Sequence, residues 1–585
     1  MGERVIRARG VCAALSIILV LTGVLAGCGS IPNSSSPQPI TSFNRQGPMN
    51  PVPVPSADMD PEALVRAFLK ATSDPQQAHR AARNFLTPTS AQQWDDRGDM
   101  VILDEINIFV DQRSADAVRL RLIGDNAGTL KSNGQLLPAT GRVEATLTLT
   151  RVGNQWRIDG PLPNGTMIDR NRFDAAYNAE LLYFTDRTRQ RLIPDPRWLY
   201  SGSDAGATSL IEHLVSGPAE DLKDAVDSAV PNGAQLRGAV TAVSGGGVQV
   251  DLTNVGSPPI RDRTVLAAQI VWTLAVANIG GPYVINADGS PLVQERSSGW
   301  QTTDVRGFDP NATPVTDVGL NVIRDGALLR VTNTATVPVG GPLGTGRTLR
   351  SAAISPDGKR VASVQAGTAP GAPGSLSIGD YGGAPASLVT GMSIMRPSFA
   401  ADENTVWTVL DGNPIQWNRA ADGSSERVAP ADASAVATVA RGPITELQIA
   451  PDGVRAAMIV GGQVVFAVVT SNDEGRLSLS NPRIAAYNIG NQAVSLDWAS
   501  PTTLMIARSA TDSPVVQLSI NGTPAVGLLS GNLSPPVRAI VADQTTVYAA
   551  DTRGVLRLGS TNGQPDQYWT EVEQAMEPGE IPVLP

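Results

Sequence analysis

The chain has 585 residues, of which 42% are hydrophobic and 17% charged, and its formal net charge is −10. Its length suggests three or four domains, and its apolar content is sufficient for folded cores. The acidic balance argues against binding to nucleic acid and against electrostatic attraction to an anionic membrane surface.

The N-terminus has the pattern of an export signal. Three arginines precede an apolar stretch over 11–25, which is shorter than the roughly 20 residues that span a membrane. The stretch ends in Leu25, Ala26, Gly27 and Cys28. These four residues resemble the lipobox of bacterial lipoproteins, in which the cysteine receives a diacylglycerol thioether and becomes the new N-terminus. We therefore expect a signal peptide over 1–27 and lipidation of Cys28; the alternatives are a transmembrane anchor or a plain signal.

Cysteine usage limits the chemistry of the mature chain. The two cysteines are Cys12, inside the predicted signal, and Cys28. Removal of the signal leaves one cysteine, which the lipid occupies, so no disulfide can form within a mature chain. Residues 28–57 are then a lipidated cysteine followed by a Pro- and Ser-rich spacer that holds the folded part away from the membrane.

Residues 58–170 predict an α+β domain. Asp60 can cap a helix that has Pro61 at its first position, and apolar residues at helical spacing follow over 64–69. A second helical stretch is expected over 78–85. Segments that alternate apolar and polar residues predict antiparallel strands over 106–110, 118–122, 143–149 and 156–159. The pattern is similar to cystatin-like and nuclear-transport-factor-like modules.

A connector is expected over 171–194, followed by an α/β domain over 195–300. Helices are predicted over 209–215 and 263–277, and strands over 235–240, 248–252 and 283–286. An ordered set of motifs resembles the GerMN domain of envelope and spore-germination proteins, at 214–218, 231–233, 248–252, 269–274 and 288–289. This resemblance implies no catalysis.

Residues 310–575 contain short predicted strands separated by turns, and one unit recurs. The segment AAISPDGKRVA at 352–362 returns as LQIAPDGVRAA at 447–457. Weaker copies extend the repeat, and intervals of 45, 50, 49 and 42 residues separate Ile354, Phe399, Ile449, Trp498 and Ile540. A period of about 40–50 residues with strand–turn–strand units is typical of a β-propeller, here of five to seven blades. The alternative is a β-sandwich with chance spacing.

No set of residues predicts a catalytic centre, a metal site or a cofactor. His79 and His213, the two histidines, lie in different predicted domains without partners at metal-ligand spacing. No G-x-S-x-G motif follows a predicted strand, and no basic patch alternates with aromatic residues. Asp357 and Asp452 lie in the two Pro-Asp-Gly units. Aspartate is favoured in such turns because its side chain bonds to the nearby main chain, so no metal ion is needed to account for these two residues. The sequence therefore predicts a protein that is not an enzyme.

The order of lipobox, spacer, α+β domain, GerMN domain and propeller resembles the actinobacterial LpqB lipoproteins. The resemblance implies a protein anchored by lipid to the cell membrane, on its extracytoplasmic face, that binds the extracellular domain of the sensor histidine kinase MtrB. It also implies a role in MtrAB two-component signalling, which controls cell-wall homeostasis and division. The alternative is a cell-wall carbohydrate-binding or hydrolytic lipoprotein, which needs several carboxylates converging on the propeller channel. A third alternative is a structural assembly factor without a signalling role.

Overall fold

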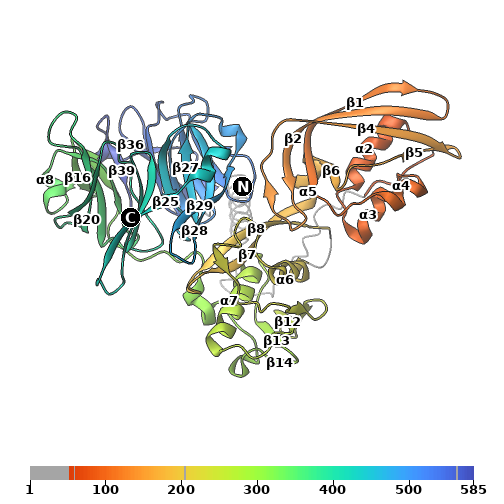
Figure 1. Ribbon diagram of the computed structural model, residues 1–585, viewed down its shortest axis with the longest axis horizontal. Helices are drawn as coiled ribbons and strands as arrows, with labels where there is room; N and C mark the ends of the chain where they lie inside the picture. The colour runs from red at the N-terminus through yellow and green to blue at the C-terminus, as the bar shows by residue number, and fades with distance from the viewer. Residues whose placement is uncertain (1–51, 58, 203–205, 562–563) are drawn as a thin grey trace, which may run out of the picture. The chain divides into compact units, whose positions relative to one another are not determined.

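Three folded regions follow one another in the computed structural model, which describes residues 52–57, 59–202, 206–561 and 564–585 (Figure 1). The predicted signal peptide, Cys28 and most of the predicted spacer lie outside these residues. The chain from Asn50 to Pro585 forms one compact unit. Within the described ranges, no helix combines the length and the apolar character needed to cross a membrane.

The first region packs helices against a sheet. Its helices are α2 (Pro61–Ala71), α3 (Gln76–Arg83) and α4 (Pro88–Gln93), and its strands are β1 (Met100–Arg113), β2 (Ala117–Leu130), β3 (Leu136–Leu137), β4 (Arg142–Val152), β5 (Gln155–Asp159) and β6 (Thr166–Asp169). The sheet order is β5–β4–β2–β1–β6, and β3 pairs with β2. Asp60 caps α2 by accepting a hydrogen bond from the Glu62 N–H at 3.1 Å. Leu64 and Phe68 of α2 share a buried core with Leu120 and Leu149 of the sheet.

The second region surrounds the long helix α7 (Ile260–Val276). It also contains α5 (Arg170–Ala176), β7 (Tyr177–Asp186), β8 (Leu192–Tyr200), α6 (Gly206–Ser216), β9 (Val226–Asp227), β10 (Gln235–Leu236), β11 (Thr241–Ala242), β12 (Val248–Thr253), β13 (Tyr283–Ala287), β14 (Ser290–Pro291), and the 3-10 helices η2 (Gln294–Arg296) and η3 (Thr302–Phe308). β12 and β13 pair in parallel, in keeping with the expected α/β class.

Two details of the second region differ from the expected elements. The stretch 171–194, expected as a connector, holds most of α5 and all of β7, and β7 pairs with β8 as a long antiparallel ribbon. Leu182 and Phe184 of this ribbon enter the same core as Leu266 and Ile270 of α7. The strand expected over 235–240 ends at Leu236, because Gly238 has a φ of +76° and turns the chain.

The third region is a β-propeller, which confirms the predicted fold. Its strands in chain order are β15 (Asn321–Arg324), β16 (Ala327–Val331), β17 (Thr336–Pro338), β18 (Leu349–Ile354), β19 (Arg360–Gln365), β20 (Gly374–Asp380), β21 (Ala386–Gly391), β22 (Ser398–Phe399), β23 (Thr405–Leu410), β24 (Asn413–Arg419), β25 (Glu426–Asp432), β26 (Ile444–Ile449), β27 (Arg455–Val460), β28 (Gln463–Ser471), β29 (Leu477–Ile484), β30 (Ala493–Ser500), β31 (Thr503–Arg508), β32 (Val515–Ser519), β33 (Val526–Gly527), β34 (Ala539–Ala542), β35 (Thr546–Ala550), β36 (Val555–Thr561), β37 (Gln564–Pro565), β38 (Thr570–Glu571) and β39 (Ile581–Val583). Four short helices lie between strands: α8 (Pro342–Thr345), η4 (Ser434–Thr438), η5 (Tyr487–Ile489) and η6 (Glu573–Ala575).

The described strands form six blades. Five blades are continuous in sequence: β18–β21, β22–β25, β26–β29, β30–β33 and β34–β38, of which the second and third are joined by a short parallel pairing of β25 with β29. The sixth combines β15–β17 with the C-terminal strand β39, which pairs antiparallel with β15. This pairing joins the two ends of the region in one sheet and closes the ring. A chance-spaced β-sandwich is therefore excluded.

The repeated residues occupy equivalent positions in the blades. Ile354, Phe399, Ile449, Trp498 and Ile540 each lie on the first strand of a blade. First strands of neighbouring blades lie against one another, so they line the propeller axis. The two Pro-Asp-Gly turns join the first strand to the second, and their glycines, Gly358 and Gly453, have φ of +75° and +78°.

Candidate functional site

His79 and His213, the two histidines considered as metal ligands, have structural roles. Cys28 and the lipobox residues Leu25, Ala26 and Gly27 lie outside the described ranges. Nδ1 of His79 lies 2.8 Å from the Asp96 carboxylate, and Nδ1 of His213 lies 2.9 Å from a main-chain oxygen of its own helix. No group of three or more His, Cys, Asp or Glu residues within the described ranges is placed to hold a metal ion.

The β7–β8 ribbon contacts both of the other regions. On the propeller side, Arg455 Nη2 donates to the Pro194 carbonyl at 2.5 Å, and Trp198 Nε1 donates to the Asn521 carbonyl at 2.8 Å. On the N-terminal side, Arg197 Nη1 donates to the Asn133 carbonyl at 2.6 Å. Each bond uses a main-chain carbonyl, so backbone positions as well as side chains are fixed. The ribbon is therefore the joint between the three regions.

Two buried ion pairs reinforce this joint. Arg197 binds Asp195 at 2.6 Å, and both side chains are 1% exposed. Arg455 binds Asp452 at 2.7 Å, and both are buried. Asp195 also accepts a hydrogen bond from the Ala219 N–H at 2.8 Å and so anchors the turn that follows α6. Buried charges are tolerated only when they are paired and hydrogen-bonded, and both pairs meet this condition.

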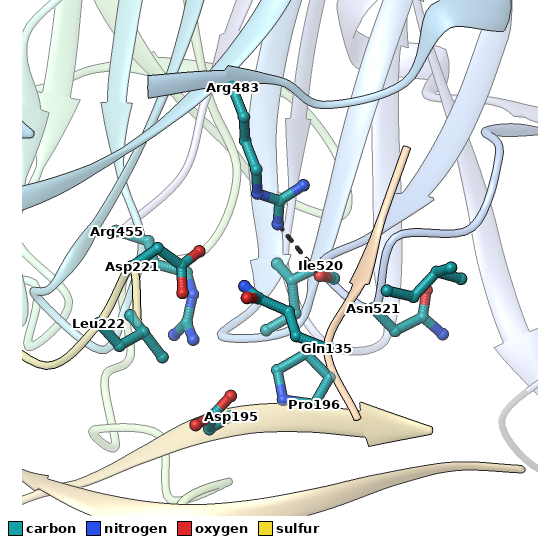
Figure 2. A pocket seen from close by; sticks show the side chains of 10 residues that line it. Gln135, Asp195, Pro196, Asp221, Leu222, Arg455, Arg483, Ile520 and Asn521 are labelled. Carbon is teal, nitrogen blue, oxygen red and sulfur yellow. Dashed lines mark hydrogen bonds between the residues drawn. The ribbon is translucent and has the colours of Figure 1, made fainter. Parts of the chain in front are cut away.

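A small polar cavity lies inside the joint (Figure 2). It has a volume of about 20 Å³, and its lining includes Asp195, Asp221, Arg455 and Arg483. Arg483 Nη2 donates to the Ile520 carbonyl at 3.4 Å, whereas Arg483 Nη1 and Asp221 Oδ1 are buried and make no hydrogen bond within the described structure. A polar cavity of this size admits one water molecule and nothing larger. It belongs to the joint and is not a ligand site.

A much larger cleft, of about 1080 Å³, opens beside this cavity and shares Gln135, Asp221 and Arg483 with it. All three regions line it. The first region supplies Asp99, Lys131, Ser132, Asn133, Gln135, Leu137 and Pro138; the second supplies Glu220, Asp221, Lys223 and Asp224; the propeller supplies Thr438, Val439, Asn481, Pro482, Arg483, Ile484 and Tyr487. Its volume is at the upper end of the roughly 300–1,000 Å³ typical of small-molecule sites. We call it the three-domain cleft.

Ion pairs and hydrogen bonds order the walls of the three-domain cleft. Lys131 binds Asp99 at 2.7 Å, and Lys223 binds Glu220. Asn481 Nδ2 donates to the Asp221 carbonyl at 2.8 Å and so joins the propeller wall to the second region. Burial lowers the pKa of the Arg483 guanidinium, Asp221 opposes this effect and Arg455 adds to it. The walls therefore have a defined polar pattern.

A second polar cluster lies at the first strands of the propeller, with Glu446 on β26, Asp497 on β30 and Arg396 just before β22. Arg396 Nη2 lies 2.5 Å from the Glu446 carboxylate and 3.8 Å from that of Asp497. Two carboxylates thus converge near the axis, which is the arrangement that the carbohydrate alternative requires. However, Glu446 is only 7% exposed, and the guanidinium lies against both carboxylates. Burial raises the pKa of each carboxyl group, while Arg396 opposes the shift. The geometry is that of a buried structural cluster.

These features define a class: a multidomain protein that presents a cleft between an α+β domain, a GerMN-type domain and a β-propeller. Three family descriptions match the chain in the same order: "Lipoprotein LpqB, N-terminal domain" over residues 54–174, "Sporulation and spore germination" over 181–293, and "Lipoprotein LpqB beta-propeller domain" over 326–585. Lipoprotein LpqB of Rhodococcus opacus is 39% identical, with 99% of this chain and 98% of that protein covered. Lipoprotein LpqB of Mycolicibacterium smegmatis is 38% identical, with 98% and 99% covered. The chain belongs to the LpqB lipoprotein family.

Solved structures resemble parts of the chain. A nidogen/laminin complex structure shares 15% identity over 46% of this chain and 98% of that chain, with a TM-score of 0.32. The tandem GerMN domains of the sporulation protein GerM from Bacillus subtilis share 18% identity over 20% of this chain and 41% of that chain, with a TM-score of 0.17.

Proposed function

We propose that this protein is a lipid-anchored accessory protein without catalytic activity that binds the extracellular domain of an MtrB-like sensor histidine kinase. On this proposal, Cys28 carries the lipid and the folded regions lie on the extracytoplasmic face of the cell membrane. Binding modulates the two-component signalling that controls cell-wall homeostasis and division. Family membership supports the lipoprotein character, and the resemblance described for the sequence supports the choice of kinase.

The observation that carries the binding role is the three-domain cleft. Its volume is at the upper limit of the range for small-molecule sites, and residues of all three regions form its walls, as a macromolecular partner would require. The hydrogen bonds of Arg455 and Trp198 join the second region to the propeller, and that of Arg197 to the Asn133 carbonyl joins it to the first region, so the walls do not have to be ordered on binding. Preorganisation of this kind lowers the entropic cost of association. A lipid anchor also raises the effective concentration of the protein toward membrane receptors.

Co-purification from membranes tests the proposal. The full-length lipoprotein is expected to retain the kinase on affinity capture after mild crosslinking in intact cells. The matched control is another lipoprotein of the same membrane, expressed at the same level. Absence of the kinase from the captured material, with the lipoprotein present in the membrane fraction, would reject the proposal.

The second candidate function, binding of cell-wall carbohydrate, can be tested with the same full-length protein. Convergence of Glu446 and Asp497 is the observation that favours it, whereas the burial of Glu446 and the ion pairs of both carboxylates with Arg396 oppose it. Binding of the full-length protein to purified peptidoglycan or arabinogalactan fragments, lost on Glu446→Gln, would support this second function.

A further inference from the structure

We propose that the three-domain cleft binds an extended cationic segment of the partner protein, with a lysine or arginine side chain at Asp224. This inference rests on the proposed function and assigns its binding surface. Two independent features of the cleft support it: the charges on its walls, and the chemistry of its uncharged lining.

Among the described residues that line the cleft, one carboxylate, that of Asp224, has no ion-pair partner, although the neighbouring Lys223 also feels its charge. Asp99 and Glu220 are bound by Lys131 and Lys223, and Asp221 faces Arg483. Asp224 is exposed, and no ion pair forms to its carboxylate within the described ranges. The cleft therefore has an excess of one negative charge.

Arg187 binds the main chain of Asp224 and forms no ion pair with its carboxylate. Arg187 Nη1 donates to the main-chain carbonyl of Asp224 at 3.3 Å and to that of Ser471 at 3.2 Å. Its guanidinium is thus directed at two carbonyl oxygens. A cation supplied by a partner would find the Asp224 carboxylate accessible, and the overall acidity of the chain would favour its approach.

The uncharged lining suits a peptide. Leu137 and Pro138 on one wall and Val439 and Pro482 on another offer aliphatic contacts that are partly exposed. Amide and hydroxyl groups between them can bond to main-chain N–H and C=O groups of an extended segment: Ser132, Asn133, Gln135, Thr438 and Asn481. Among the described residues of the lining, Tyr487, 44% exposed, is the single aromatic one. A glycan site would need several aromatic faces on which sugar rings can stack, and this lining offers one. The lining therefore favours an extended peptide over a glycan.

A charge-reversal variant tests whether the Asp224 carboxylate binds a cationic side chain of the partner. Asp224→Lys in the full-length lipoprotein is expected to weaken binding to the kinase extracellular domain at least tenfold, with the largest effect at low salt. The matched control is Glu212→Lys, which makes the same charge change at an exposed position of α6 in the same region. Equal weakening by both variants, or none by Asp224→Lys, would overturn the inference while leaving the proposed function intact.

Photo-crosslinking locates the partner. A photoreactive phenylalanine analogue replaces Tyr487 in the cleft or, as the control, Tyr568, which is 70% exposed on the propeller outside the cleft lining. We expect Tyr487 to crosslink to a basic stretch of the kinase and Tyr568 not to do so. Crosslinks to the kinase from Tyr568 alone, or from Tyr487 to glycan, would reject the cleft assignment. Absence of kinase crosslinks together with failed co-purification would reject the proposed function and this inference with it.

Discussion

Arg455 of the propeller donates a hydrogen bond from Nη2 to the main-chain carbonyl of Pro194 in the β7–β8 ribbon, at 2.5 Å. The same guanidinium binds Asp452 through Nη1 at 2.7 Å. Asp452 belongs to a Pro-Asp-Gly turn and also accepts a hydrogen bond from the Val454 N–H at 2.8 Å. One turn therefore shapes its blade and positions the arginine that joins two regions.

The first prediction concerns this joint. Arg455→Met leaves the Asp452 carboxylate buried without its cation and the Pro194 carbonyl without its donor. Breaking a buried ion pair typically costs about 3–5 kcal/mol, so calorimetry of the full-length chain should show a clear fall in Tm. Arg476→Met is the control, because Arg476 and Glu474 form an exposed pair with side chains 77% and 66% exposed. Similar small shifts for the two variants would contradict the role of the joint.

The second prediction concerns ring closure. Val583 of β39 is 3% exposed and packs in a core with Ile323 and Leu328 of the blade that it completes. Val583→Asp buries an unpaired carboxylate in the closing strand and should cost about 3 kcal/mol or more. Val526→Asp makes the same substitution where the side chain is 65% exposed on β33, and should change the free energy of unfolding by under about 1 kcal/mol. Urea unfolding monitored by circular dichroism compares the two; equal stability would count against closure by β39.

The propeller could be predicted because its signal is local and repeated. Each Pro-Asp-Gly turn is specified by adjacent residues, and the repeat register places Ile354, Phe399 and Ile449 on equivalent strands. The exact blade number could not be predicted, since the sixth blade combines β15–β17 with β39 from the other end of the region. Such a pairing depends on ring closure, which no local pattern encodes.

The buried cluster near the axis had a sequence signal that was overlooked. Arg396, Glu446 and Ser495 each lie three residues before an aligned repeat residue, and Asp497 lies one before Trp498. Arg396, Glu446 and Ser495 therefore fall at equivalent repeat positions beside neighbouring inner strands, and Ser495 Oγ lies 3.4 Å from Glu446 Oε1.

The three-domain cleft could not be predicted in the same way. Its lining comes from three regions, and nothing in the sequence near Lys131, Asp224 or Tyr487 shows that they meet. The joint beneath the cleft also depends on bonds from side chains to distant carbonyls, such as Trp198 to Asn521. Main-chain acceptors occur at every residue, so a sequence does not indicate which one is used.

The third prediction concerns the anchor. Cys28→Ser removes the thiol that would carry the lipid, so the protein should leave the membrane fraction or accumulate with its signal peptide uncleaved. Two or three acyl chains bind a bilayer stably at about 0.8 kcal/mol per buried methylene, whereas one chain is marginal. Fractionation with detergent phase separation measures the effect, and Cys12→Ser is the control because that residue lies within the predicted signal. Unchanged partition of signal-cleaved Cys28→Ser into the detergent phase would refute lipid anchoring, because a form that keeps its apolar signal peptide enters the detergent phase for another reason.

The fourth prediction concerns pH and the cluster at Arg396. Burial raises the pKa of Glu446 and of Asp497, and Arg396 only partly offsets this effect. A carboxyl group with a raised pKa in the folded state contributes stability that is fully present below its ordinary pKa, near 4, and is lost as pH rises through the raised value. The wild-type propeller should therefore lose this contribution as pH rises from about 4 through the raised pKa values.

Glu446→Gln isolates that loss, because glutamine imitates the protonated acid and does not titrate. The stability of the variant relative to wild type should rise with pH across this window. Carboxyl groups with lowered pKa, such as those of Asp357 and Asp551, lose their contribution as pH falls, but they do so in both proteins and cancel in the difference. Calorimetric Tm values of the two full-length proteins at matched pH provide the measurement. A difference that stays constant with pH would show that Glu446 is ionised throughout and that Arg396 outweighs its burial.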